Sequence, residues 1–141
     1  AARPGAAMIQ TACPEHPVMQ AILSGEVETF LEREAAGRWQ AGVPPFGRMA
    51  AVILSGPKEP AVWEAGQRLA AAHAPLSAVG ARLLGPVAAP IARIRGRFRV
   101  RMLVKAPRTA ALHEALRTWM AAAPPPASVR LSLDMDPQSF L

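Results

Sequence analysis

The C-terminal two thirds of the chain alternates between stretches with the twofold period of strands and stretches with the 3.6-residue period of helices. Residues 91–105 form the clearest strand pattern, because small or apolar residues occupy every second position. The best helical pattern follows Pro107, where Leu112 and Leu116 belong to one apolar stripe. Pro107 itself suits the first turn of that helix. The predicted elements are strands over residues 49–54, 79–84, 91–105 and 129–134, and helices over residues 60–73 and from 107 to the prolines at 124–126.

These elements follow the order βαββαβ, which predicts an α+β fold with an antiparallel sheet and both helices on one face. This is the ferredoxin-like arrangement, and right-handed connections make it compact. Ahead of it, residues 7–13 are β-prone, residues 16–23 have a helical pattern, and Ser24 is a suitable N-cap for a second helix. The predicted fold is therefore a ferredoxin-like sandwich preceded by one strand and two helices.

Two prolines between glycines interrupt the chain at residues 42–47, Gly-Val-Pro-Pro-Phe-Gly. Such a segment is typical of a rigid connector, because proline fixes its own backbone angle. We therefore predict a domain over residues 1–41, a connector over 42–47 and a second domain over 48–141. No apolar run approaches the ~20 residues of a membrane helix. The single cysteine, Cys13, excludes an intrachain disulfide.

Charge is distributed unevenly along the chain, whose formal net charge is +6. Residues 14–34 contain five acids and one base, whereas residues 82–117 contain nine bases and one acid, Glu114. A field of this kind favours a polyanionic partner over a small neutral substrate. Arginine enrichment in a GC-rich genome is the simpler alternative. Composition therefore suggests a nucleic-acid contact without proving one.

Five arginines occupy alternate positions of the predicted third strand. Alternate residues of a strand share a face, so apolar side chains are predicted to face the helices and guanidinium groups to face outward. The like charges of such a row repel one another, which destabilises the fold unless an anion lies nearby. Guanidinium groups bind phosphate oxygens in bidentate fashion. The alternative is a solvated outer face whose charges discourage aggregation. The candidate DNA-binding residues are Arg93, Arg95, Arg97, Arg99, Arg101 and Lys105.

No motif in the sequence predicts catalysis. His16, His73 and His113 lie on separate predicted elements, so a metal site is not expected. The carboxylates of Asp134 and Asp136 are more simply explained as a solvated strand end. A glycine-rich phosphate loop and a nucleophile motif are both missing from the sequence. We therefore expect neither enzyme activity nor a cofactor in this chain.

Several segments resemble, in order, the C-terminal end of the primosomal protein N′ family, the PriA replication-restart DNA helicases. These segments cover nearly the whole chain. The proline-rich junction at residues 42–48, taken together with the basic strand at residues 95–99, is fairly specific for the family. One departure is Val43, where the family usually has tyrosine. The matching segments are Met8-Ile9-Gln10-Thr11, Pro14-Glu15-His16-Pro17-Val18, Phe30, Arg33-Glu34, Arg38, the junction at residues 42–48, Leu84-Gly85-Pro86, Arg95-Gly96-Arg97-Phe98-Arg99, Leu103-Val104-Lys105 and Asp134-Met135-Asp136-Pro137.

The resemblance implies an ATP-dependent helicase that unwinds DNA 3′→5′ and restarts stalled forks in the bacterial cytoplasm, at the nucleoid. ATP with magnesium, and zinc, would be bound by the parent protein upstream of this chain, whose residues 1–41 would be the tail of the second helicase lobe. The remaining domain would resemble ribosomal protein S10. Its implied partners are branched or forked DNA, single-stranded DNA-binding protein and primosome proteins, with Arg108 near a basic residue implicated in docking that protein's acidic tail.

Three functions are therefore open from the sequence. The first is a non-catalytic fragment, expected to be monomeric, that binds branched DNA. The second is a protein-docking module, in which the same cations and an adjoining apolar pocket hold an acidic peptide ending in a hydrophobic residue. The third is a small-molecule regulatory domain of the βαββαβ type, against which the row of arginines argues.

Overall fold

The structure is a computed structural model that describes residues 5–138. The chain divides into two compact units, and the division falls between Gly37 and Arg38, a few residues before the predicted connector. No helix within the described residues has the length and apolar content needed to cross a membrane.

The N-terminal unit contains α1 (Pro17–Ser24) and most of α2 (Val27–Ala41). His16 caps α1, because its Nδ1 accepts a hydrogen bond from the backbone N–H of Val18 at 3.3 Å. Gly25 ends α1 in the left-handed conformation, with φ of 72°. Both predicted helices are thus confirmed, but neither contains a buried residue.

The strand predicted over residues 7–13 is wrong, because these residues have no regular secondary structure. Their β-prone side chains have no neighbouring strand in the described chain with which to pair. Backbone N–H and C=O groups of an isolated strand gain no internal partners, so the strand conformation is not stabilised by side-chain preference alone.

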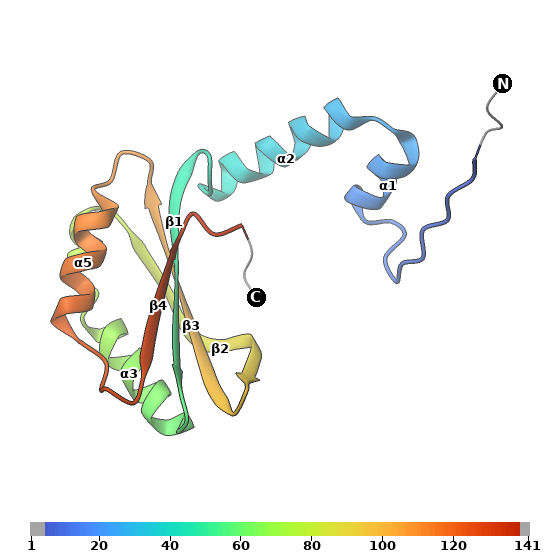
Figure 1. Cartoon of the computed structure of the whole chain (residues 1–141). Helices are drawn as coiled ribbons and strands as arrows, with labels where there is room; N and C mark the ends of the chain where they lie inside the picture. Colours follow the sequence, from blue (N-terminus) through green and yellow to red (C-terminus); the bar gives the residue numbers. More distant parts are fainter. Residues whose placement is uncertain (1–4, 139–141) are drawn as a thin grey trace. The chain divides into compact units, whose positions relative to one another are not determined.

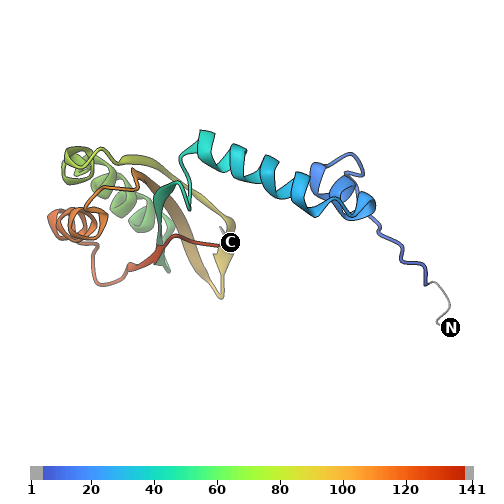
Figure 2. The ribbon, with the colours of Figure 1, turned by 90° about the horizontal axis from the view of Figure 1, so that it is seen from above.

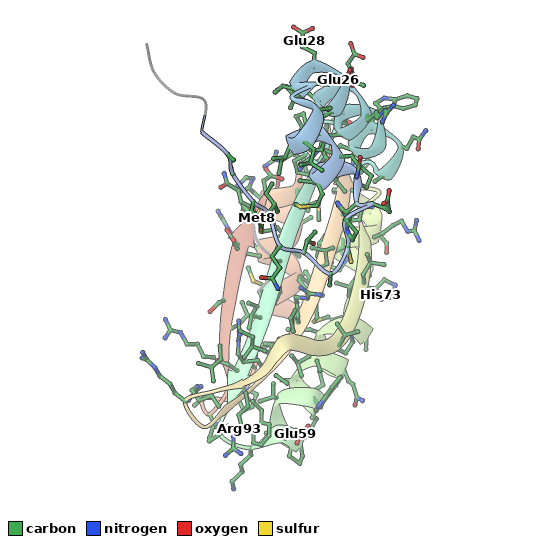
Figure 3. The ribbon with its side chains drawn as sticks, turned by 90° about the vertical axis from the view of Figure 1, so that its right-hand side faces the viewer. Met8, Glu26, Glu28, Glu59, His73 and Arg93 are labelled. Carbon is green, nitrogen blue, oxygen red and sulfur yellow. The ribbon has the colours of Figure 1, made fainter. Side chains whose placement is uncertain are left out.

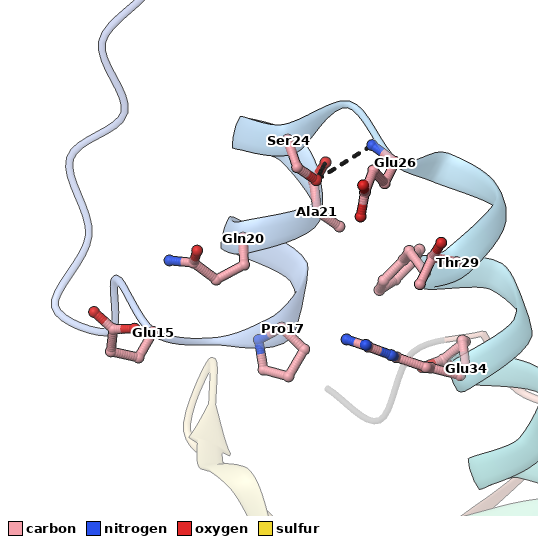
Figure 4. Close-up of a pocket in the computed structure, with 10 residues that line it drawn as sticks. Glu15, Pro17, Gln20, Ala21, Ser24, Glu26, Thr29 and Glu34 are labelled. Atoms are coloured by element: carbon pink, nitrogen blue, oxygen red, sulfur yellow. Dashed lines mark hydrogen bonds between the residues drawn. The ribbon is translucent and has the colours of Figure 1, made fainter.

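A cleft of about 570 Å³ separates α1 from α2. Figure 4 shows it lined by polar side chains from both helices, including Gln20 and Glu34. The Ser24 hydroxyl accepts a hydrogen bond from the backbone N–H of Glu26 at 3.3 Å, in the turn between the helices. The N-terminal unit is therefore held by local contacts rather than by an enclosed core.

The C-terminal unit is an antiparallel four-stranded sheet in the order β2-β3-β1-β4, with α3 and α5 on the same side of it (Figures 1 and 2). Apart from one short extra helix, the predicted βαββαβ order is confirmed. The elements are β1 (Gly47–Gly56), α3 (Glu59–Ala71), α4 (Ala74–Ala78), β2 (Arg82–Ile94), β3 (Arg97–Pro107), α5 (Leu112–Ala122) and β4 (Arg130–Met135).

The hydrophobic core lies between the sheet and these helices. Alternate residues of β1 and β3, such as Val52 and Val104, point into it and have no exposed surface. Trp119 of α5 is fully buried, and its indole N–H donates to the backbone oxygen of Leu69 in α3 at 2.8 Å. Gly66 of α3 lets the helix approach β2, since a Cβ there would lie 3.1 Å from that of Pro86. The core thus joins both helices to the sheet.

Three predicted element boundaries differ from the structure between residues 79 and 112. The predicted strand over residues 91–105 is two strands, because a turn at Arg95-Gly96 separates β2 from β3. Pro107 does not begin a helix but ends β3, and α5 begins at Leu112. The strand predicted over residues 79–84 instead runs from Arg82 to Ile94, with register shifts at Gly85-Pro86 and after Ala88.

Candidate functional site

The face of the sheet opposite α3 and α5, which we call the open face, carries side chains from all four strands. The register defines it, because directly paired residues of neighbouring strands point to the same side. Arg101, for example, pairs with Ile53 of β1 and with Val87 of β2. The open face comprises Met49, Ala51, Ile53 and Ser55 of β1, Arg82, Leu84, Val87 and Ile94 of β2, Arg97, Arg99, Arg101, Leu103 and Lys105 of β3, and Arg130, Ser132 and Asp134 of β4.

The open face is strongly basic. Successive same-face residues of a strand lie ~6.6 Å apart, and neighbouring strands lie ~4.8 Å apart. Arg99 pairs with Ser55, which pairs in turn with Arg130, so these two arginines lie ~10 Å apart across the sheet. Asp134 is the one acid on this face among the described strands. The cations are Arg82, Arg97, Arg99, Arg101, Lys105 and Arg130.

Backbone carbonyls hold several of these cations against the sheet. Arg97 Nη2 donates to the oxygen of Ser55 at 2.8 Å, and Arg99 Nη1 donates to that of Ile91 at 3.3 Å. Lys105 Nζ donates to the oxygen of Ala41 at 2.6 Å, at the end of α2. A single bond uses one of the five guanidinium donors of Arg97. These bonds therefore hold the side chains in one orientation, so that less conformational entropy is lost when they bind an anion.

The row of five arginines predicted from the sequence is only partly correct. Arg97, Arg99 and Arg101 share the open face, as predicted, and they are half-buried. Arg93 pairs with Phe98, whose ring packs against the core, so Arg93 lies on the opposite side of the sheet. Arg95 is in the turn, with φ of 48°. A two-residue turn reverses which parity faces the open side, and this is why the alternation fails there.

Arg82 and Arg130 were missed as members of this site. Arg82 follows α4 and begins β2 opposite Lys105. The predicted strand began at residue 79 instead, so the sequence did not assign Arg82 to a face of the sheet. Arg130 alternates with Ser132 and Asp134 along β4, and this polar alternation is visible in the sequence. Pairing of β4 with β1 is what brings Arg130 beside the arginines of β3.

Residues 39–138 match the family model of the primosomal protein N C-terminal domain. The chain belongs to this family. It is 29% identical over 136 residues to the replication restart protein PriA of Rickettsia felis, 31% over 140 residues to that of Treponema pallidum and 33% over 137 residues to that of Synechocystis. These matches cover 96%, 97% and 97% of the chain.

The chain spans about a fifth of the length of these PriA relatives, at 20%, 21% and 16% respectively. The family model includes all four strands and therefore the whole open face. The predicted family membership is confirmed, and the site is a feature of a primosomal protein N C-terminal domain.

A groove adjoins one end of the open face in this primosomal domain. It has a volume of about 430 Å³ and is lined by apolar Phe46 and Leu84 beside the cations Arg82 and Lys105. Phe46 and Leu84 are 40% and 42% exposed. Arg108 lies in the exposed turn just after Pro107, which also lines the groove. The groove thus combines apolar surface with positive charge.

Beyond the open face, Asp136 binds the start of β1. Its Oδ1 accepts from the backbone N–H of Met49 at 2.8 Å, and its Oδ2 accepts from Arg48 Nε at 3.3 Å. Asp136 is therefore a structural residue rather than half of a solvated pair with Asp134. Within residues 5–138, the His, Cys, Asp and Glu side chains nowhere form a group of three or more that could hold a metal ion.

Proposed function

We propose that the open face binds the phosphate backbone of DNA. The observation that carries this proposal is the concentration of six cations against one acid on the side of the sheet that the helices leave uncovered. Phosphate contacts by Arg and Lys supply sequence-independent affinity. Sequence readout is not part of the proposal, because α3 and α5 lie on the other side of the sheet and present no helix to a groove.

In the longer protein, this domain would bind branched DNA while other segments hydrolyse ATP and bind zinc. The chain's family and the name of its relatives, replication restart protein, support this assignment. We propose that the parent is a 3′→5′ helicase acting at stalled forks at the nucleoid. The domain itself contributes binding rather than catalysis.

Salt dependence tests the phosphate contacts. We expect the 141-residue chain to bind a labelled forked DNA, measured by fluorescence anisotropy. If all six cations of the open face contact phosphates, log K should fall against log salt with a slope of about −5.4, at about 0.9 per contact. A slope near zero, or binding unchanged between low and moderate salt, would contradict the proposal.

A second candidate function is docking of an acidic peptide that ends in an apolar residue, such as the tail implied for single-stranded DNA-binding protein. The groove beside Phe46 supports it, because Arg82 and Lys105 can attract the acids while Phe46 and Leu84 contact the terminal side chain. Arg108 at its margin adds positive charge.

Docking and DNA binding are separable by the peptide's last residue. We expect an acidic peptide with a terminal phenylalanine to bind, and Phe46→Ala to weaken it about tenfold, the effect of losing one buried apolar contact. Leu133→Ala is a matched control, since Leu133 is 38% exposed on the other edge strand. Equal binding of a peptide without the terminal residue would exclude docking in the groove.

A further inference from the structure

The hairpin that joins β2 to β3 ends in a two-residue turn of an unusual composition. Its tip, residues 93–97, has Arg95 with φ of 48° and Gly96 with φ of 76°, the conformation of a type I′ turn. Such turns favour Asn, Asp or Gly at the first position, and arginine is disfavoured there. A side chain kept in an unfavoured conformation at an exposed tip indicates a use for that side chain.

The tip extends beyond the end of β1. Pairing between β1 and β3 ends at Gly56 and Phe98, so residues 93–97 pair only within the hairpin of β2 and β3. A Cβ built on Gly96 would meet no atom within 4 Å, and the space around the turn is therefore open. Arg93 and Glu59 lie at this same end of the unit (Figure 3).

An exposed aliphatic side chain lies among the cations of the tip. Ile94 is 40% exposed and pairs directly with Arg97, so both side chains point to the open face. An apolar side chain flanked by guanidinium groups is the combination by which minor-groove and architectural proteins insert a wedge between base pairs while holding the adjacent phosphates.

Three contacts brace the tip. The guanidinium of Arg93 lies over the ring of Phe98, 5.0 Å from its centroid, in a cation–π contact. Arg97 donates to the Ser55 oxygen, and Arg99 donates to that of Ile91 across the hairpin. Bracing of this kind gives the hairpin the stiffness that a wedge requires.

We propose that the tip binds where double-stranded DNA opens into single strands, with Ile94 against the last base pair and Arg95 and Arg97 on the flanking phosphates. The inference rests on the proposed DNA binding of the open face and names the part of the DNA that the tip contacts. The last pair of a duplex has a stacking neighbour on one side only, so displacing it costs less than opening an internal step.

The test uses the 141-residue chain and a forked DNA with 2-aminopurine in the last base pair before the fork. The second probe is an unforked duplex of equal length that carries 2-aminopurine in an internal base pair. Binding of the unaltered chain is expected to raise the fluorescence at the fork but not in the duplex. Ile94→Ala is expected to abolish this rise and to weaken fork binding about tenfold, with duplex binding changed by less than about twofold.

Leu133→Ala is the matched control, because Leu133 is 38% exposed and pairs with Val52, on the side of the sheet away from the open face. It should leave both probes unchanged. The wedge is overturned if Ile94→Ala keeps the fluorescence rise and the fork preference, or if Leu133→Ala loses them equally. If the true ligand of the tip were an acidic protein, Ile94→Ala would keep both the fluorescence rise and the fork preference. Failure of the unaltered chain to bind either DNA would overturn the proposed function itself, and the wedge with it.

Discussion

The two units of the chain differ in how they are stabilised. Every buried hydrophobic residue of the described chain lies between Met49 and Val129, whereas α1 and α2 bury none. Large apolar side chains of the N-terminal unit are instead exposed, including Met8 at 96% and Leu23 at 70%. The C-terminal unit therefore holds its own hydrophobic core, and the N-terminal unit does not.

This difference separates stability from function within the C-terminal unit. Its helix-covered side supplies the core, because hydrophobic burial is the main favourable contribution to folding. The open face is consequently available for charged side chains that would destabilise a buried site. The substitutions that follow test this division, in order of decreasing expected effect.

The largest expected effect is on the core. Trp119→Ala should reduce the free energy of unfolding by about 3–5 kcal/mol, because it leaves a cavity and removes the hydrogen bond to Leu69. Trp39→Ala is the matched control, since Trp39 is 69% exposed on α2 and should cost less than about 0.5 kcal/mol. Urea denaturation followed by far-UV circular dichroism measures both. Equal losses would show that the end of α2 contributes to the core.

A smaller effect is expected where β4 is tied to β1. Asp136→Ala should cost about 1–2 kcal/mol in unfolding free energy, because the Met49 N–H loses its acceptor and Arg48 loses its ion pair. Asp134→Ala, which changes the same charge on an exposed residue of β4, should change the free energy by less than about 0.5 kcal/mol. A larger loss of unfolding free energy in Asp134→Ala than in Asp136→Ala would refute the structural role of Asp136.

The turn at the hairpin tip should respond in the opposite direction. Arg95→Gly should stabilise the C-terminal unit by about 0.5–1 kcal/mol, because glycine adopts positive φ without the steric cost that arginine has. The same change should weaken DNA binding by removing a cation. A lower melting temperature in this variant would contradict the assigned turn conformation.

The smallest effect is expected from removing the N-terminal unit. A chain of residues 38–141 should unfold with a free energy within about 0.5 kcal/mol of that of the full chain. An isolated peptide of residues 1–37 should show little helix by circular dichroism, since short helices without tertiary packing are marginal in water. A loss of more than about 2 kcal/mol on truncation would mean that the two units share their stability.

The sequence predicted the C-terminal fold well because its apolar periods match its elements. Leu112, Leu116 and Trp119 recur at helical spacing and are buried together in α5. Val100, Met102 and Val104 alternate in β3 and face the core, as predicted. In both cases a single element buries one face, so the pattern along the chain is enough to identify it.

The hairpin was not predicted because its turn leaves the twofold alternation unbroken. Arginine at positions 93, 95 and 97 continues through the turn, and Arg95-Gly96 lacks the Asn-Gly or Asp-Gly pair that usually marks it. The open face depends further on which strands are neighbours. Placing Arg130 beside Arg99 requires the order β3-β1-β4, which is a tertiary property.

The most direct test of the open face compares two double variants of equal charge in the binding of forked DNA. Arg97→Ala with Arg99→Ala removes two cations from the open face, and Arg68→Ala with Arg117→Ala removes two exposed cations from α3 and α5. The first should reduce the magnitude of the salt slope by about 1.8, at about 0.9 per phosphate contact, and the second should leave it unchanged. Equal reductions would show that net charge, rather than the open face, binds the DNA.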